Sequence, residues 1–534
     1  MQMIRVVTLW LLVLISQVVL AEDFTPNHTV KIPMRDGTEL PADIYLPKSF
    51  SPETKAPCIL LRSPGGRQAA SARTYLPLTH AGYTVVIQDT RSSVDATGST
   101  LPYCTDGWGK EQDGYDTVEW LAKSPYTNGR IGTTGMSALG ITQLLMAPSA
   151  PPSLKCQYIS MAASSMYHDA IYPGGALLKN QVEGWLGLYA KAPEVLKFVC
   201  SQPHYNKFWE RFDTALAAHQ VRVPAIHYGG WYDIFVQGTI NAFVSRHERG
   251  GEGAKDKQKL IIGPWTHFWP VHTKLGDFEM PDIAKTPPVD LSPKRWFDHY
   301  LKGIDNGIDR EPAITYYVMG PLDGTPTSGN VWRHTDRWPV PSVETAFYLH
   351  GDKKLSDKQG DTGSLSYEHD SRNPVPTNGG GNLFLESGPK DQRLIEERKD
   401  VVVFTSDPLN QEMEITGRIS AELYCSTNAP QMDVVVRLTD VYPDGRSILI
   451  CDGVKHVTAP SQSKPAPVLV DLWSTSIAVA KGHRLRISVT NSNYPKCEKW
   501  AQEGAPEVTT HNLYFGESTP SRLILPVVRN SGKS

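Results

Sequence analysis

Short apolar runs recur along the first half of the chain, and each ends in turn residues. Runs that are apolar and β-branched throughout are typical of strands buried on both faces of a parallel sheet. Helical patterns separate them, so we predict an α/β fold with an open, doubly wound sheet. The strand runs are "CILLRS" (58–63), "YTVVIQDTR" (83–91), "GRIGTTGMS" (129–137), "CQYISMAAS" (156–164), "PAIHYGGWYD" (224–233) and "KLIIGPWTH" (259–267), and the helical stretches are 111–124, 138–147 and 238–248.

The pattern changes twice later in the chain. Residues 172–217 hold two helical stretches, too long for a single crossover, and we predict a helical cap inserted over the carboxyl edge of the sheet. From residue 312 the runs alternate polar and apolar positions and are separated by turns such as "PDG". Alternation of this kind predicts an all-β sandwich or jelly roll. We therefore expect an α/β domain at 22–311 and a β domain at 312–534.

Length and charge are consistent with this division. The chain has 534 residues, more than one hydrophobic core normally supports. Its formal net charge is -3, so no overall positive field would recruit nucleic acid or an anionic membrane.

The first residues suggest export. Arg5 precedes an apolar run from Val6 to Leu20, and Val19-Leu20-Ala21 resembles a signal-peptidase site. We predict a signal peptide at 1–21, cleaved near Ala21, and a periplasmic or extracellular protein with no membrane span in the mature chain; an uncleaved anchor is the alternative. Export permits disulfides, but the seven cysteines are an odd number, so at least one stays free or pairs between chains.

The candidate chemistry centres on "GMSALG" (135–140), where Ser137 stands between a predicted strand and a predicted helix. A nucleophilic serine at such a sharp turn needs small neighbours. The next backbone N–H, that of Ala138, would lie at a helix N-terminus and point at a developing oxyanion. A plain turn is the simpler reading of these residues alone.

Two later residues favour the nucleophile. Asp233 ends one predicted strand and His267 ends the next, so serine, acid and histidine occur in the chain order of α/β-hydrolases. The carboxyl ends of parallel strands face one crevice, where such residues can meet. The alternatives are a helix N-cap for Asp233 and a loop histidine for His267.

The chain resembles the cocaine-esterase-type (CocE/NonD) serine hydrolases, relatives of the Xaa-Pro dipeptidyl-peptidases. The resemblance lies in "VVIQDTR", "DGYDTVEWLA", "NGRIGTTGMSALG", "GGWYDIF", "IIGPWTH", "LTDVYPDGRSI" and "GHRLRISVTNSNYP". It implies an α/β-hydrolase domain with a cap and a carboxy-terminal jelly roll. It also implies Ser137 as nucleophile, His267 as general base and acid, and Asp233 as the residue that orients the imidazole.

One departure concerns the second oxyanion donor. Family members commonly have a tyrosine after the first core strand, in "RxPY", whereas this chain has Gly65 there, in Arg62-Ser63-Pro64-Gly65-Gly66. Either the enzyme is weak, or the Gly65-Gly66 backbone comes close and offers an N–H. A simple proline-glycine turn remains the third interpretation.

The substrate pocket is less well defined by sequence. Trp185 in the cap and Phe235 match positions that often line the acyl pocket in this family, and Trp231 lies nearby; core packing is the alternative for all three. Apolar residues follow Asp233 where amine-recognising relatives place carboxylates, which argues against an α-amino-acid ester substrate. No metal or nucleotide motif is present, so we expect no metal and no cofactor.

Two function classes follow. The first is an exported serine hydrolase that cleaves a small-molecule or peptide ester or amide through an acyl-enzyme, with possible dipeptidyl-peptidase-like activity. The second is an inactive hydrolase scaffold that binds a glycan or a cell-surface partner. The intact serine, aspartate and histidine favour the first, and the missing tyrosine favours the second.

Overall fold

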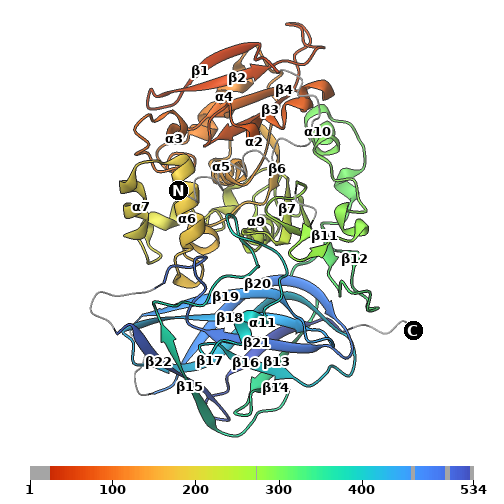
Figure 1. The fold of residues 1–534 in the computed structure, drawn as a ribbon. Helices are drawn as coiled ribbons and strands as arrows, with labels where there is room; N and C mark the ends of the chain where they lie inside the picture. Colours follow the sequence, from red (N-terminus) through yellow and green to blue (C-terminus); the bar gives the residue numbers. More distant parts are fainter. Residues whose placement is uncertain (1–23, 272–273, 459–463, 500–505, 530–534) are drawn as a thin grey trace.

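In a computed structural model, residues 24–271, 274–458, 464–499 and 506–529 are described. The chain folds into an α/β domain followed by a β domain, one above the other in Figure 1. The predicted fold class is therefore confirmed. The predicted signal peptide at 1–21 lies outside the described residues.

The first domain is built on a 10-stranded sheet in its described part. Strands β3 to β8 and β11 are parallel to their neighbours, while β1 and β2 at one edge and β12 at the other are antiparallel. The six central strands match the six predicted runs. In sheet order the strands are β1 (His28–Pro33), β2 (Glu39–Tyr45), β4 (Thr84–Asp89), β3 (Cys58–Ser63), β5 (Ile131–Met136), β6 (Leu154–Ser160), β7 (Ala225–Tyr232), β8 (Gln258–Thr266), β11 (Ile314–Val318) and β12 (Val331–Thr335).

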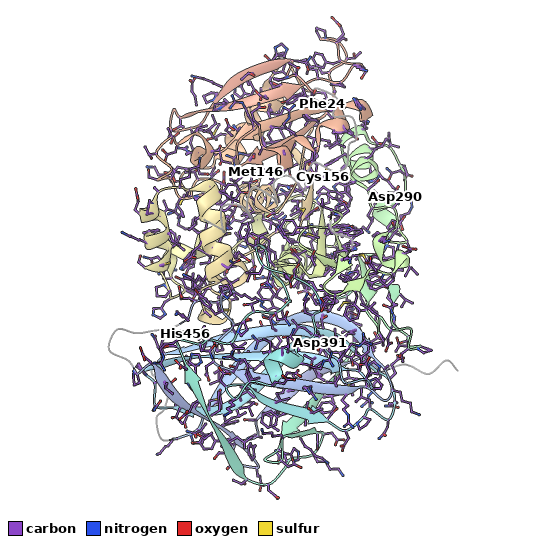
Figure 2. All side chains as sticks on the ribbon, viewed as in Figure 1. Phe24, Met146, Cys156, Asp290, Asp391 and His456 are labelled. Carbon is purple, nitrogen blue, oxygen red and sulfur yellow. The ribbon has the colours of Figure 1, made fainter. Side chains whose placement is uncertain are left out.

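Helices cover the sheet because each presents an apolar side to it. The three predicted helices are α4 (Asp113–Lys123), α5 (Ala138–Met146) and α9 (Val236–Arg249). A fourth, α10 (Pro293–Lys302), has local start and stop signals: the Ser292 side chain accepts a hydrogen bond from Arg295 N–H, and Gly303 ends the helix at φ +72°. Met146 and Cys156 lie in the interior of this domain (Figure 2), and both are buried.

The predicted cap is present between β6 and β7. Its helices are α6 (Lys179–Tyr189), α7 (Pro193–Cys200) and the short α8 (Lys207–Glu210). Figure 1 shows α6 and α7 together at one side of the first domain. Trp185, Leu186 and Val195 of the cap share one apolar cluster with Ala138 of α5, so the cap and the start of that helix belong to one core.

The second domain consists almost entirely of strands. They are β13 (Val343–Leu349), β14 (Lys354–Ser356), β15 (Gly363–Asp370), β16 (Val402–Ser406), β17 (Met413–Thr427), β18 (Gln431–Val441), β19 (Ser447–Thr458), β20 (Ala466–Val479), β21 (Arg484–Thr490), β22 (Val508–Phe515) and β23 (Arg522–Val527). The long strand β17 pairs with β20, β22 and β23, all antiparallel. The predicted boundary at 311/312 falls before β11, yet β11 and β12 complete the first sheet. By strand pairing, the β domain therefore begins at β13.

The two domains are joined by buried hydrogen bonds. Met319 N–H donates to Ser476 O at 2.9 Å, and Ala478 N–H donates to Met319 O at 2.8 Å. The N–H and hydroxyl of Ser474 in β20 donate to Gln237 Oε1 of α9 at 3.0 and 2.9 Å. Gln237 lies only four residues after Asp233, so the β domain supports the site region directly.

Two further observations concern export and redox state. All seven cysteines fall within the described residues, and none is in a disulfide. No helix in the described ranges has both the length and the apolar character needed to cross a bilayer.

Candidate active site

Ser137 stands at a strained turn between β5 and α5. Its backbone has φ +59° and ψ −122°, a conformation that non-glycine residues rarely adopt. Ser137 N–H donates to Ser160 O at 3.0 Å, and Ser137 O accepts from the N–H groups of Gly140 and Ile141. Strain of this kind persists only where the surroundings enforce it, and it is concentrated at functional sites.

The two glycines that bracket Ser137 have steric reasons to be there. A Cβ on Gly135, at φ +144°, would lie 2.4 Å from Leu139 Cβ. A Cβ on Gly140 would lie 2.8 Å from Ala162 Cβ on the far side of the turn. No side chain fits at either position, so the glycines allow the turn that exposes Ser137.

His267 and Asp233 complete a hydrogen-bonded line with the serine. His267 Nε2 lies 3.0 Å from Ser137 Oγ, and His267 Nδ1 lies 2.5 Å from Asp233 Oδ1. The other carboxylate oxygen of Asp233 accepts the N–H of Phe235 at 3.0 Å, which fixes the carboxylate plane. Asp233 and His267 are 1% and 3% exposed, so bulk water does not compete for this line.

This geometry can activate an alcohol. The imidazole nitrogen facing Ser137 can accept the hydroxyl proton, while the carboxylate holds the opposite N–H and stabilises the imidazolium. Ala138 occupies the first turn of α5, where its N–H has no acceptor within the helix. That N–H is free to bind negative charge developing beside Ser137.

The chain is similar to known hydrolases and peptidases. The family model for X-Pro dipeptidyl-peptidase (S15 family) matches residues 36–198 and 185–269, and that for the X-Pro dipeptidyl-peptidase C-terminal non-catalytic domain matches 306–524. Cocaine esterase of Rhodococcus sp. (strain MB1 Bresler) is 28% identical over 593 residues, which cover 95% of this chain and 99% of that protein. The chain belongs to the cocaine-esterase-like (CocE/NonD) serine hydrolases.

Solved structures share the fold of this hydrolase. An aminopeptidase from a marine sediment archaeon (Thaumarchaeota archaeon) superposes with a TM-score of 0.77 at 21% identity, covering 96% of this chain and 99% of that one. An α-amino acid ester hydrolase superposes with a TM-score of 0.75 at 21% identity, covering 96% and 100%. In each case both domains are included in the match.

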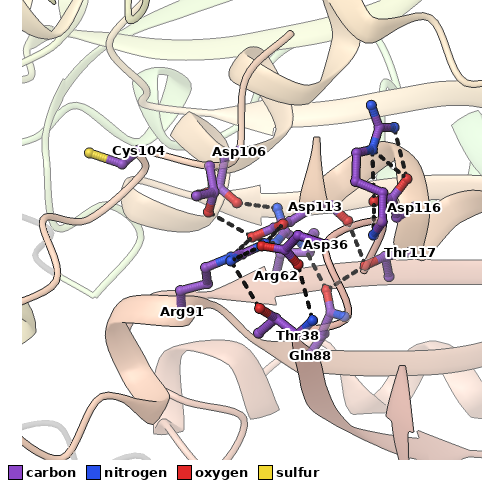
Figure 3. A network of polar contacts seen from close by, with 12 residues as sticks. Asp36, Thr38, Arg62, Gln88, Arg91, Cys104, Asp106, Asp113, Asp116 and Thr117 are labelled. Carbon is purple, nitrogen blue, oxygen red and sulfur yellow. Dashed lines mark hydrogen bonds and ion pairs between the residues drawn. The ribbon is translucent and has the colours of Figure 1, made fainter. Parts of the chain in front are cut away.

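A network of polar contacts includes Arg62, which lies at the end of β3 and leads into the loop that carries Gly65 (Figure 3). Arg62, the residue before Ser63 at the end of β3, pairs with Asp106, donates to Gln88 Oε1 at 2.8 Å, and lies 4.0 Å from Asp113. Burial raises the pKa of the Asp106 carboxyl, with Arg62 acting in the opposite direction. Thr142 of α5 donates to Arg62 O at 3.1 Å. The network therefore ties this loop to the helix that begins beside Ser137.

The Gly65-Gly66 loop differs from what the backbone-donor interpretation requires at Gly66. The Gly66 N–H donates to Ser63 O at 3.1 Å, and the Ser63 hydroxyl donates to Gly66 O at 2.8 Å. Gly66, at φ +88°, thus closes a tight turn, and its N–H is already occupied. Gly66 is therefore not available as an oxyanion donor, and of the two glycines only Gly65 has an N–H without an acceptor in the described part of the chain.

The three predicted pocket residues separate into two groups. Trp185 and Phe235 belong to the apolar cluster that includes Ala138, and the Phe235 ring meets the His267 ring edge-on at 5.6 Å. Trp231 belongs to the other, larger cluster; its indole N–H donates to Tyr317 O at 2.7 Å, and it packs on Trp338. Trp231 is therefore packed in the core beside β11, but it also lines a cavity together with Asp233 and Ile234, so its role in the pocket stays a prediction.

A loop of the β domain, residues 379–384, reaches the site. A Cβ on Gly381 would lie 3.2 Å from Asp233 O, and Leu383 packs against the cluster that holds Phe235. The Phe384 ring lies against Gly184 of the cap helix α6. The consecutive glycines at 379–381, with Leu383 and Phe384 one residue beyond them, were the available signal for a close approach.

Metal-binding residue types do not gather at this site. In the described residues, the one group whose ligand atoms lie within 4.8 Å of one another is His299, Asp305 and Asp309, at the end of α10. Two of these residues are exposed, and acidic clusters of this kind are common without an ion.

Proposed function

We propose that this serine hydrolase is exported and cleaves an ester or amide through an acyl-enzyme, with Ser137 as nucleophile. The observation that carries the proposal is the line from Ser137 Oγ through His267 to Asp233, at 3.0 and 2.5 Å. The predicted signal peptide at 1–21 is the basis for export.

The reaction proceeds in two balanced steps. Ser137 Oγ attacks the substrate carbonyl carbon as its proton passes to His267 Nε2; the tetrahedral oxyanion collapses, and His267 gives the proton to the departing alcohol or amine. Water then attacks the acyl-enzyme, losing a proton to His267, and the acid leaves as Ser137 regains its proton. Asp233 keeps the imidazole oriented and stays ionised throughout.

An uncharged acyl group fits this site best. Ile234, Phe235 and Val236 follow Asp233 and are only 2%, 2% and 3% exposed, so no carboxylate pair is present there to hold a substrate amine. The relative with 28% identity is named an esterase, which supports an ester as the preferred substrate.

A fluorophosphonate probe tests the nucleophile, because only an activated serine reacts with it. We expect wild type to be labelled and Ser137→Ala to be unlabelled, with turnover lower by a factor of about 10⁶. The control is Ser201→Ala in the cap, whose exposed hydroxyl donates only to Phe198 O. Labelling of Ser137→Ala at the wild-type rate would refute the assignment.

The same experiment addresses the alternative function. A folded wild-type protein that neither reacts with the probe nor hydrolyses acyl esters or Xaa-Pro amides would favour the inactive scaffold that binds a glycan or surface partner. Export is tested separately, by sequencing the amino terminus of protein from the periplasm or medium. A mature chain that begins at Glu22 supports cleavage, and a chain retained with residues 1–21 contradicts it.

A further inference from the structure

The second oxyanion donor is the part of the proposed mechanism that the glycine loop leaves open. An oxyanion hole normally supplies two hydrogen bonds, and each contributes about 2.7–4 kcal/mol to the transition state. Ala138 N–H provides one, and Gly66 N–H is occupied by Ser63 O.

A side chain from the cap occupies the space in front of Gly65. A Cβ built on Gly65 would lie 3.3 Å from Cε1 of Tyr189, the last residue of α6. Cε1 is the ring carbon next to the one that bears the hydroxyl, so the hydroxyl is two bonds from the atom that faces Gly65. The phenol of Tyr189, which comes from the cap, thus occupies the space that a side chain at position 65 would fill.

The tyrosine ring is held in this place on several sides. The Trp185 ring lies 6.3 Å from the Tyr189 ring, and the Tyr103 ring packs edge-on against Trp185. The backbone just after Tyr189 is fixed by Ala192 N–H, which donates to Gly98 O at 3.2 Å. Tyr189 also packs on the cluster that contains Ala138 and Phe235, the neighbours of the proposed nucleophile and acid.

The Tyr189 hydroxyl is available as a donor. It makes no hydrogen bond to another described residue, although its side chain is half-buried. Burial raises the pKa of Tyr189, which keeps the phenol protonated at neutral pH.

We propose that the Tyr189 hydroxyl is the second oxyanion donor of this enzyme, delivered by the cap helix across Gly65. The inference rests on the proposed function, since it names a further catalytic residue of that reaction. The hydroxyl donates a hydrogen bond to the substrate oxygen as it becomes an oxyanion and retains its proton. A side chain longer than a methyl group at position 65 would displace the phenol ring, because a Cβ there would already lie 3.3 Å from Tyr189 Cε1.

The test is Tyr189→Phe, which removes the hydroxyl and keeps the ring. We expect kcat for an acyl ester to fall about 10²–10³-fold, with KM changed little, because the bond strengthens only as charge develops. Fluorophosphonate labelling should slow by a similar factor without being abolished. Affinity for an aryl boronic acid, whose serine adduct places an oxygen in the oxyanion position, should weaken in parallel.

The matched control is Tyr205→Phe, another cap tyrosine, whose hydroxyl bonds Asp213 at 3.0 Å and whose loss should leave kcat and labelling unchanged. Thermal unfolding of both variants shows that each is folded. Wild-type kcat, labelling and boronate affinity in Tyr189→Phe would overturn the inference and assign the second donor to Gly65 N–H. If wild type itself is not labelled, the proposed function and this inference both fall.

Discussion

Gly135 faces Leu139 so closely that a methyl group added to the glycine would lie 2.4 Å from the leucine Cβ. Leu139 is in the first turn of α5 and buried, so it has no room to withdraw. We predict that Gly135→Ala lowers the free energy of unfolding by about 2–4 kcal/mol, from overpacking and the strain of φ +144°. Chemical denaturation measures the loss, and probe labelling should fall with it.

The matched control for that change is Gly109→Ala. Gly109 has open space within 4 Å of its added Cβ and is not at positive φ. The free energy of unfolding should therefore change by no more than about 0.5 kcal/mol. Equal effects of the two variants would contradict the steric account of the turn.

At position 137, glycine should give a more stable protein than alanine, which is the reverse of the usual order. Both Ser137→Ala and Ser137→Gly remove the hydroxyl, so both lose the bond to His267, but only glycine accepts φ +59° without strain. We predict that Ser137→Gly is more stable than Ser137→Ala by about 1 kcal/mol. Differential scanning calorimetry of the two inactive variants decides this; an equally stable or more stable alanine variant would show that the turn is unstrained.

Loss of one partner of the buried Arg62–Asp106 pair should strongly lower the free energy of unfolding. Arg62 and Asp106 side chains are each 2% exposed, so Arg62→Met leaves a buried carboxylate unpaired and should cost about 3–5 kcal/mol. Adding Asp106→Leu removes that carboxylate, and the double variant should recover most of the loss in urea unfolding. A double variant whose loss equals the sum of the two single losses would mean that the pair is not coupled.

Asp169 provides a prediction about pH. Its buried carboxyl accepts the N–H of Ser164 at 3.0 Å and of Ser165 at 2.8 Å, yet burial raises its pKa to about 6. The unfolded chain releases this proton near pH 3.9, so the folded state holds the proton more tightly across the interval. The contribution of Asp169 to the free energy of unfolding is therefore fully present below pH ~4. It falls by about 3 kcal/mol as the pH rises to about 6.

The measurement compares Asp169→Asn with wild type between pH 4 and pH 7. Because asparagine cannot ionise, the stability of the variant relative to wild type should increase over this range. The control is Asp256→Asn, whose side chain is 74% exposed. A constant difference between Asp169→Asn and wild type would contradict the raised pKa.

The triad positions could be predicted because each lies at the end of a strand that reads as buried. Parallel strands bring their carboxyl ends to one edge, so chain order and strand ends alone bring Ser137, Asp233 and His267 together. The same reasoning does not decide between core and pocket for Trp231, because a strand end does not fix which neighbours a large side chain meets. Its indole bonds Tyr317 O in the core, whereas Phe235, past the strand end, meets His267.

Other features depend on tertiary packing that sequence patterns do not carry. Tyr189 reads as an ordinary cap residue, and its contact with Gly65, 124 positions earlier, follows only from how α6 lies on the sheet. The edge strands β11 and β12 alternate like the strands of the β domain, so pattern alone assigned them there. Pairing of Ile314 with Leu260 places them in the first sheet instead.

The contacts of Gly381 with Asp233 and of Ser474 with Gln237 also bear on when the enzyme becomes active during its synthesis. A ribosome delivers the Ser137, Asp233 and His267 segments long before it delivers residues 381 and 474. Until those later residues arrive, Asp233 O lacks its covering loop, and the buried Gln237 lacks its two donors. The nascent hydrolase domain therefore stays unfinished until most of the chain has been made, and the completed protein, rather than a fragment, is the unit that acquires activity.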